Sequence, residues 1–370
     1  MEKFRIIDAD SHIEEVVETW DYLDAAFQSR RPFPVTVDKN IGHTNLNAFW
    51  YIDGAAVPKL EGPGTILIAT PLTSKYAQSK PFSIGSQGLT DIKARLRDLD
   101  DFGLDVQVIY PTLFLANVTD DLAFEAALMR AYNSYLAQAC GQASERLKWA
   151  GIVPLRSPVE AAKEVRRCKD LGAVAIATLG TAGESLLHDK SLFPVYAEIE
   201  RLNLPLCVHV GWSHPGLNKS CENIYVSRIS FTLPVLAAFW SILGGGVLDE
   251  FPRLRVAFLE AGSEWLPYWV GRMDHYYHAD IGNARGGYMP KKRPPEYLKE
   301  GRVFFTCEAE EASLPVVLEL LGEDQMMASA DIPHGEARER SMDIVRERTD
   351  LSERAKRKIL GENAERFYNL

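Results

Sequence analysis

Hydrophobic and polar positions follow a repeating pattern along the chain from about residue 90 onward. Short, nearly continuous apolar runs, which are typical of buried strands, alternate with stretches in which apolar residues recur every three or four positions, as in helices. Strands of this kind that are each followed by a helix indicate a parallel sheet covered on both faces. The pattern predicts strands at 4–7, 106–110, 147–153, 173–179, 205–210, 254–259, 303–306 and 325–330, and helices at 16–23, 91–102, 122–145, 157–171, 193–202, 228–251, 263–278, 312–321, 336–348 and 352–367.

About eight strand and helix units follow one another, which is the number that closes a TIM barrel. We therefore expect an α/β fold in which residues 1–370 form a single (β/α)8 barrel. An open, doubly wound sheet is the alternative. The glycine-rich phosphate loop that usually follows the first strand of that fold is missing here, which favours the barrel.

The segment 28–88 departs from this regular alternation. It is rich in Pro, Gly, Asn and Ser, and it contains Asp53-Gly54 between two apolar runs. An Asp-Gly pair in this setting is a strong hairpin signal. A structureless loop of this length is unusual inside a compact domain. We therefore expect 28–88 to be an insertion in the barrel, with a hairpin, that forms either a small subdomain or a lid over a site.

Composition limits the class of partner. The formal net charge is -10, which disfavours nucleic acid and anionic membrane surfaces and leaves a small molecule as the expected partner. No uninterrupted apolar run approaches the roughly 18 residues that span a bilayer, and the first apolar run is too short for a signal peptide. We expect a cytoplasmic protein. The five cysteines lack CxxC spacing, which argues against a disulfide framework or a structural zinc site.

The end of the first strand carries the first candidate chemistry. Asp10 and His12 are two residues apart, so on an extended backbone both side chains leave on the same face. A carboxylate and an imidazole so placed suit a divalent ion such as Zn, Mn or Fe. The alternative is that Asp10 caps the following helix and His12 is an ordinary residue at a strand end.

Ionisable residues also stand where other predicted strands end. In a TIM barrel these ends converge on one rim, where the active site is built. Burying so many charged groups together is costly unless a cation neutralises them, so a metal ion is the simplest explanation. The residues at strand ends are Asp10, His12, His209, Glu260, Glu308 and Asp331, with Tyr110 and Thr112 beside the second strand.

Each of these residues has a simpler interpretation. His209 is either a ligand or a hydrogen-bonded core residue, and Asp331 either touches the ion and moves a proton or caps the next helix. Ligand, base and cap are equally open for Glu260. His214, in the loop that follows the strand of His209, either contacts substrate or is incidental. His334 either orients Asp331 or reaches substrate.

Taken in order, these motifs resemble a known family. The resemblance spans most of the chain and is carried by Ile7-Asp8-Ala9-Asp10-Ser11-His12, by 99–106, by the strand with His209, by 251–262 and by 329–334. The chain resembles the metal-dependent amidohydrolase-related family, in the branch typified by aminocarboxymuconate semialdehyde decarboxylase and γ-resorcylate decarboxylase. This resemblance implies a distorted TIM barrel with one divalent ion, commonly Zn or Mn. The positions that correspond to the ligands are Asp10, His12, His209 and Asp331.

The chain departs from the family pattern at two positions. The common His-x-His of the first strand is Asp10-x-His12, which adds negative charge and favours a harder or redox-capable metal over zinc. The histidine of the sixth strand in typical members, which is thought to act on bound water, is replaced by Glu260. This second departure leaves the reaction open.

Two reactions use the same ligands. In the first, the carboxylate and a neighbouring oxygen of an aromatic or unsaturated acid bind the ion, Asp331 delivers a proton to the carbon, and carbon dioxide leaves. In the second, Asp331 or Glu260 takes a proton from activated water, which attacks an amide, an ester or a C–C bond beside a carbonyl. The family favours decarboxylation. A barrel that only binds a ligand is a third hypothesis.

Aromatic residues on the outer helices bear on quaternary structure. The stretch 231–247 and the helix that carries Trp265 and Trp269 contain more aromatic residues than a barrel exterior usually needs. They are consistent with a homodimer, and equally consistent with packing of these helices on the barrel itself.

Overall fold

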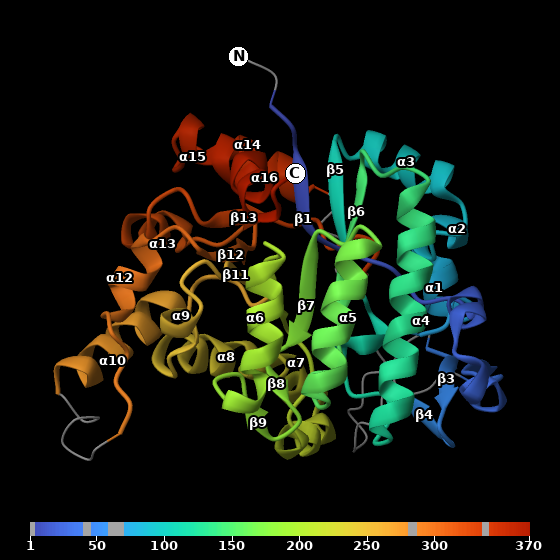
Figure 1. The fold of residues 1–370 in the computed structure, drawn as a ribbon. Coiled ribbons are helices and arrows are strands. Elements are labelled where there is room, and N and C mark those ends of the chain that lie inside the picture. The colour runs from blue at the N-terminus through green and yellow to red at the C-terminus, as the bar shows by residue number, and fades with distance from the viewer. Residues whose placement is uncertain (1–3, 40–45, 58–69, 280–286, 335–339) are drawn as a thin grey trace.

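Eight parallel strands form one sheet in the computed structural model, which describes residues 4–39, 46–57, 70–279, 287–334 and 340–370. Each strand pairs in parallel with the next. The predicted parallel sheet is confirmed. Nearly all residues of its strands are buried because helices cover the sheet (Figure 1). In order, the strands are β1 (Ile7–His12), β5 (Val106–Tyr110), β6 (Leu147–Ile152), β7 (Ala175–Leu179), β10 (Leu206–His209), β11 (Val256–Leu259), β12 (Val303–Cys307) and β13 (Met326–Ala328).

The first and last strands are joined across a seam that closes the barrel. The backbone N–H of His12 donates to the carbonyl of Ile332 over 2.7 Å, and that of Asp331 donates to the carbonyl of Asp10 over 3.2 Å. The guanidinium of Arg95 lies fully buried at this seam, and its Nη2 donates to the carbonyls of His12 and Ile332 over 3.1 Å each. Burial lowers the pKa of Arg95 to about 10, so the side chain stays charged at neutral pH.

The helices lie outside the sheet, largely where the pattern predicts them. One difference is the predicted helix 228–251, which the structure divides into three. Another is 352–367, which contains a π-helical turn. The main helices are α3 (Ile92–Asp101), α4 (Leu122–Gly141), α5 (Pro158–Asp170), α6 (Phe193–Arg201), α7 (Ile224–Ser230), α8 (Leu233–Gly244), α9 (Val247–Glu250), α10 (Leu266–His278), α12 (Pro294–Lys299), α13 (Leu314–Leu321), α14 (Ser341–Glu347), α15 (Glu353–Arg357), the π-helix η6 (Lys358–Glu362) and α16 (Asn363–Tyr368).

Short elements occupy the connections between these helices and strands. Where a helix was predicted at 16–23, the structure has a 3-10 helix. The predicted helix 336–348 begins in residues outside the described part, and its described portion is α14. The short elements are the 3-10 helices η1 (Val17–Tyr22), η2 (Ala25–Arg30), η3 (Leu113–Leu115), η4 (Lys190–Leu192) and η5 (Pro215–Glu222), and the hairpin of β8 (Thr181–Ala182) and β9 (Ser185–Leu186).

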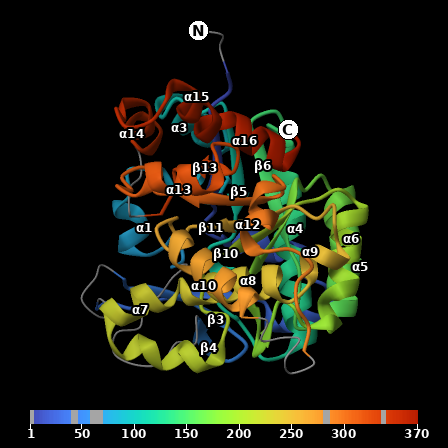
Figure 2. The same cartoon turned by 90° about the vertical axis from the view of Figure 1, so that its left-hand side faces the viewer.

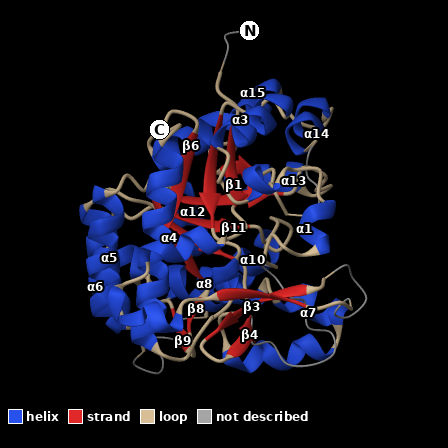
Figure 3. Cartoon of the chain, turned by 90° about the vertical axis from the view of Figure 1, so that its right-hand side faces the viewer, coloured by secondary structure: helices blue, strands red, loops and turns tan. Residues whose placement is uncertain are grey.

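The insertion contains a small antiparallel sheet of β2 (Phe33–Thr36), β3 (Ala48–Ile52) and β4 (Ala55–Val57), followed by α1 (Lys75–Ser79) and α2 (Ile84–Gln87). Asp53 and Gly54 join β3 to β4 with φ angles of 52° and 80°. Figures 2 and 3 show β3 and β4 at one end of the barrel and α14 and α15 at the opposite end. Parts of 28–88 lie outside the described residues, and the lid role of the insertion stays a prediction.

One stretch of the described residues, Tyr225–Gly244, has the length and composition of a membrane-spanning helix. This corrects the expectation from uninterrupted apolar runs, because polar residues interrupt the stretch while its mean hydropathy stays high. The structure divides it between α7 and α8, and half of its most apolar window is buried. Val235 and Phe239 of α8 have no exposed surface, as in the core helix of a barrel.

The aromatic residues of the outer helices pack on one another and on the core. Trp240 of α8 lies 5.2 Å from Trp269 of α10, and Trp265 lies 5.0 Å from the core residue Phe239, measured between ring centroids. This contact is the arrangement expected if the helices pack on the barrel. A homodimer stays a prediction.

We predict that Gly180→Ala destabilises the protein. A Cβ at Gly180, which follows β7, would lie 2.0 Å from the carbonyl oxygen of Pro234 in α8, so helix and strand must move apart. Overpacking of this kind costs roughly 1 to 3 kcal/mol in the free energy of unfolding, measured by denaturant titration. Gly141→Ala is the control: its Cβ meets nothing within 4 Å, and loss of the glycine in α4 stabilises by about 0.5 kcal/mol or more. Equal stability of both variants would contradict this packing.

Candidate metal centre

The end of β1 is shaped by a break in its pairing with β5. The register shifts between Asp8 and Ser11, and the strand continues to His12, five residues beyond the predicted end. The carboxylate of Asp8 accepts hydrogen bonds from the backbone N–H of Ala330 over 2.9 Å and from the Gln107 amide over 3.1 Å. Asp8 therefore braces the loop after β13. Burial raises the pKa of Asp8 to about 6, partly offset by a hydrogen bond from Ser11.

The imidazoles of His12 and His209 are oriented by backbone carbonyls. Nδ1 of His12 lies 2.9 Å from the carbonyl of Pro111, and Nδ1 of His209 lies 3.0 Å from that of Val210. A carbonyl only accepts, so each Nδ1 carries the proton and donates it. In the neutral ring each Nε2 then offers a lone pair. This arrangement is the usual one for a metal-binding histidine, whose second nitrogen is held by a hydrogen bond.

Ligand atoms from four strands and their loops converge on one place. Nε2 of His209 lies 3.4 Å from Oδ1 of Asp10 and 3.2 Å from Oε2 of Glu260. Nε2 of His12 lies 3.7 Å from Oδ1 of Asp10, 3.8 Å from Oε2 of Glu260 and 3.4 Å from Oδ1 of Asp331. Atoms that bind one ion at about 2.1 Å lie roughly 3 to 3.5 Å apart in tetrahedral or octahedral geometry, which is close to these separations.

The structure brings all four predicted ligands, Asp10, His12, His209 and Asp331, together with Glu260. Two overlapping groups have ligand atoms within 4.8 Å of one another, and both contain His12 and Glu260. Asp10 and His209 complete the first group, while Asp331 and His334 complete the second. Glu260 is thus placed among the candidate ligands, as two of its three interpretations require.

The first group contains buried polar atoms without hydrogen bonds. Among the described residues, both carboxylate oxygens of Asp10, Nε2 of His12, Nε2 of His209 and Oε2 of Glu260 have no hydrogen-bond partner. Leaving one such atom unsatisfied costs about 1 to 3 kcal/mol, and more for a charged one. A divalent ion would satisfy all of these atoms at once, so the residues present fit a metal ion.

The pKa shifts at this site follow from burial and from the charges that the barrel brings together. Burial raises the pKa of Glu260, and the nearby charge of Asp331 raises it further. Burial lowers the pKa of His12 well below its usual value, and His334 and His209 add to the effect. His209 differs: although burial opposes its protonation, Asp10 and Glu260 raise its pKa well above the usual value. A cation is favoured where these carboxylates meet.

Glu260 and Asp331 both have left-handed backbone conformations, with φ of 55° and 54°. Such a conformation costs about 1 kcal/mol or more at a residue other than glycine, and it persists where the surroundings hold it. The N–H of Glu260 donates to Oγ1 of Thr306 over 2.8 Å, and the N–H of Asp331 is held at the seam. These turns aim both carboxylates inward at the strand ends.

Asp331 forms an ion pair with His334, which is hydrogen-bonded in turn to Thr112. Nδ1 of His334 lies 2.8 Å from Oδ1 of Asp331, and Nε2 lies 2.8 Å from Oγ1 of Thr112. Thr112 donates its hydroxyl proton to the carbonyl of Ile13, so it accepts from Nε2 of His334. A second proton is then needed between Nδ1 and Asp331. His334 and Asp331 therefore share a proton beside the candidate ligands.

His334 also stacks on His12, with ring centroids 4.0 Å apart. The sequence placed His334 near Asp331 but gave no sign of this stacking, which depends on the backbone turn at Asp331. Glu15 was not singled out either. Its buried carboxylate accepts from the backbone N–H groups of Thr112 and Leu113 over 3.1 and 2.8 Å, and burial raises its pKa to about 8.

His214 and Glu308 lie outside both groups of ligand atoms. Nδ1 of His214 accepts a hydrogen bond from the N–H of Gly216 over 3.0 Å and caps η5. The structure therefore does not bring His214 to the metal ligands, and its contact with substrate stays a prediction. Glu308 lies next to Glu311, which accepts from the N–H of Glu308 and holds the loop after β11 through Ser263.

Comparison with known proteins places this site in context. The amidohydrolase family model matches residues 85–370. The 2-amino-3-carboxymuconate-6-semialdehyde decarboxylase of Dictyostelium discoideum is 26% identical over 285 residues, which are 76% of this chain and 77% of that protein. The γ-resorcylate decarboxylase of Rhizobium sp. (strain MTP-10005) is 25% identical over 295 residues, which are 76% of this chain and 88% of that protein.

Two solved structures show the same fold along the whole chain. An amidohydrolase of Mycobacterium avium subsp. paratuberculosis K-10 has a TM-score of 0.79 at 19% identity and covers 100% of this chain and 99% of its own. The 5-carboxyvanillate decarboxylase of Novosphingobium aromaticivorans, complexed with manganese and 4-hydroxy-3-methoxy-5-nitrobenzoic acid, has a TM-score of 0.71 at 21% identity and covers 99% and 96%. The predicted TIM barrel is confirmed.

We predict that the protein binds one divalent ion per chain and that Asp10→Ala with His12→Ala abolishes binding. Metal content by elemental analysis and affinity by calorimetric titration with Mn²⁺ measure this directly. An ion at a thousandfold excess over its Kd stabilises the fold by about 4 kcal/mol, which a thermal unfolding scan detects. His278→Ala is the control, because its side chain is 61% exposed on α10. Unchanged metal content in the double variant would contradict the site.

Proposed function

Because this chain belongs to the amidohydrolase family, we propose that it is a metal-dependent enzyme that decarboxylates a small aromatic or unsaturated carboxylic acid. The family is the one that its sequence motifs resemble. Relatives named as decarboxylases of a carboxymuconate semialdehyde and of γ-resorcylate support the reaction class. The observation that carries the proposal is the convergence of unpartnered ligand atoms beside a proton shared by Asp331 and His334.

Asp10, His12, His209 and Asp331 would hold the ion, with Glu260 as a further oxygen ligand or as a neighbouring base. When bound, the ion supplies positive charge that binds the substrate's carboxylate and a neighbouring oxygen and that withdraws electrons as the C–C bond breaks. A set of several carboxylates with two imidazoles suits manganese or iron as well as zinc. A solved relative of the same fold contains manganese.

Asp331 is the group that we assign to proton transfer. As the bond between the ring carbon and the carboxylate breaks, carbon dioxide leaves without its bonding electrons. The electron pair stays on the carbon, which takes the proton from Asp331 and forms a C–H bond. The proton that His334 shares with Asp331 over 2.8 Å then restores the acid. Thr112 and His12 hold the His334 ring in position for this transfer.

Hydrolysis is the second candidate, and Glu260 is the observation that favours it. Glu260 provides a second carboxylate beside Asp331, and burial raises its pKa toward the range in which a carboxylate accepts and returns a proton. In this reaction Glu260 or Asp331 takes a proton from water, which attacks an amide, an ester or a carbonyl-activated C–C bond. A small-molecule partner and a cytoplasmic location are common to both proposals.

We predict that the manganese-loaded protein releases carbon dioxide from one or more hydroxybenzoates and releases no amine from a matched panel of benzamides. In D₂O the product should carry one deuterium at the carbon that loses the carboxylate, because Asp331 exchanges its proton with solvent. Proton NMR measures the label and a coupled assay measures carbon dioxide. Release of amine without release of carbon dioxide would show that the reaction is hydrolysis and not decarboxylation.

Asp331→Asn should lower turnover by about 10²- to 10⁴-fold, because the amide cannot deliver the proton. The comparison is made at saturating manganese, with bound metal measured in parallel to separate loss of the proton donor from loss of a ligand. Asp21→Asn is the control, since Asp21 is 59% exposed, pairs with Arg31 and is not among the candidate metal ligands. Full turnover in Asp331→Asn would refute the assignment.

A further inference from the structure

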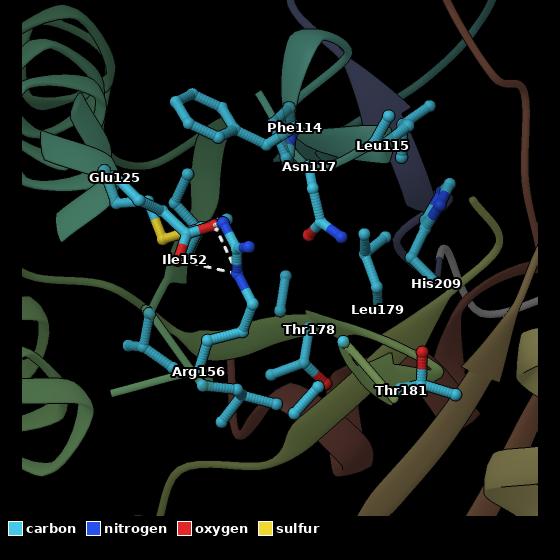
Figure 4. A pocket seen from close by; sticks show the side chains of 18 of the residues that line it. Phe114, Leu115, Asn117, Glu125, Ile152, Arg156, Thr178, Leu179, Thr181 and His209 are labelled. Atoms are coloured by element: carbon cyan, nitrogen blue, oxygen red, sulfur yellow. Dashed lines mark hydrogen bonds and ion pairs between the residues drawn. The ribbon is translucent and has the colours of Figure 1, made fainter. Parts of the chain in front are cut away.

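A small cavity adjoins the candidate metal centre over the ends of β5, β6 and β7. Its volume is about 50 Å³, and its lining includes the proposed metal ligand His209 and Tyr110, whose ring lies 5.9 Å from that of His209. Figure 4 shows His209 on one side of the cavity and the pair Arg156 and Glu125 on the opposite side, with Asn117 and Thr178 between them. The cavity therefore leads from a proposed ligand toward a charged pair.

The walls of the cavity are mostly apolar. Phe114, Leu115, Ile152 and Leu179 line it between the two ends. A single water needs about 10 to 15 Å³ of such volume, so the cavity holds a group of a few heavy atoms and not a second ring. Its size suits a substituent on a substrate whose acid group lies at the metal ligands.

The far end of the cavity offers hydrogen-bond donors. Arg156 binds the buried carboxylate of Glu125 through Nη2 at 2.6 Å and through Nε at 3.2 Å, and Nη2 also donates to the carbonyl of Thr119 over 2.5 Å. No hydrogen bond within the described part of the chain uses Nη1 of Arg156. Thr178 is 8% exposed, and its hydroxyl has no hydrogen-bond partner among the described residues. A buried hydroxyl of this kind is available to donate a hydrogen bond to a polar group of a bound ligand.

The charges at this end cancel. Arg156 is positive, and Glu125, which is 3% exposed, is negative and in direct contact with it. A second carboxylate on the substrate would lie near Glu125. Arg156, the only Lys or Arg among the described residues that line the cavity, is already paired with Glu125, and burying an uncompensated charge is costly. A neutral oxygen, by contrast, accepts from Nη1 and from the Thr178 hydroxyl without disturbing the ion pair.

We propose that this cavity selects a substrate with a small neutral substituent that carries an acceptor oxygen, such as a ketone, ether or amide, and rejects the corresponding dicarboxylate. Thr178 and Arg156 are the specificity-determining residues, and Glu125 sets their charge preference. The inference rests on the proposed function for the position of the acid group at the metal ligands.

The test uses nitrophenols, because a nitro group takes the place of the carboxylate and cannot be removed as carbon dioxide. Three ligands are titrated by calorimetry into the manganese-loaded protein: 2-nitrophenol and its derivatives with an acetyl group or a carboxylate at one ring position. The acetyl and carboxylate groups have nearly the same shape and differ in charge. The acetyl derivative should bind at least about tenfold more tightly than the carboxylate.

Two variants assign this preference to the cavity. In Glu125→Gln the charge of Arg156 is uncompensated, so the ratio of the two Kd values should move toward the carboxylate by about tenfold or more. Thr178→Val should weaken binding of the acetyl derivative by about 3- to 10-fold and leave the Kd of 2-nitrophenol unchanged. Glu160→Gln, at an exposed position of α5, is the charge-matched control and should change neither value.

The inference is overturned if the carboxylate binds the native protein as well as the acetyl derivative, if no ligand binds, or if a folded Glu125→Gln keeps the native ratio. Should Glu125→Gln fail to fold, Thr178→Val decides alone, and equal weakening of all three ligands overturns the proposal. Because calorimetry measures binding and not turnover, and 2-nitrophenol and its acetyl derivative have no carboxylate to lose, the outcomes separate from those of the proposed function. If the ligands bind in the predicted order but no acid is decarboxylated, the role of the cavity is supported and the proposed reaction is rejected. If an acid is decarboxylated but the ligands do not bind in this order, the reaction is supported and the role of the cavity is rejected.

Discussion

The structure depends on positive charge among carboxylates that the barrel brings together. Asp10, Glu260 and Asp331 come from three different strand ends, and their oxygens meet two imidazole nitrogens at separations of 3.2 to 3.8 Å. In a buried site these carboxylates repel one another, and the oxygens of Asp10 and Oε2 of Glu260 have no hydrogen-bond partner among the described residues, which is unfavourable by several kcal/mol in sum. A divalent ion removes both costs. The free energy of metal binding and the geometry of the strand ends are therefore linked.

The surroundings of the site hold these residues against that repulsion. Asp10 and Asp331 are joined by a backbone hydrogen bond across the seam between the first and last strands. The buried guanidinium of Arg95 donates to backbone carbonyls on both sides of this seam. The left-handed turns at Glu260 and Asp331 are further costs that the packed barrel sustains. Strain and unpaired charge concentrate at the same rim, as is usual for a site that is preorganised for binding.

The same rim also carries the features that choose a substrate. The loops after β5, β6 and β7 form the walls of the cavity beside His209, so the metal ligands and the cavity share the ends of neighbouring strands. The loop after β5 approaches the loop after β10 so closely that a Cβ at Gly211 would lie 2.3 Å from the carbonyl of Leu115. A glycine is required there, also because its φ is 152°. Loop variation at this rim changes specificity without changing the barrel.

Periodicity determined the fold. The apolar runs and helical stretches predicted eight strands in the observed order, because a strand buried on both faces needs apolar residues throughout. The ends of elements were less exact: the first strand extends to His12, since a break in its register with β5 lets Asp10 and His12 remain in the strand. The helix predicted at 228–251 divides into three, with breaks before Pro234 and at Gly246, which has φ of 88°.

What the sequence by itself determined is the barrel, the family and the candidates Asp10, His12, His209, Glu260 and Asp331, because strand ends in a closed parallel sheet must converge. What only the tertiary structure decided is how those side chains meet. It placed Glu260 among the ligands, stacked His334 on His12, left His214 as a helix cap and neutralised Arg156 with Glu125. These outcomes depend on backbone turns and on contacts between loops far apart in sequence, and periodicity specifies neither.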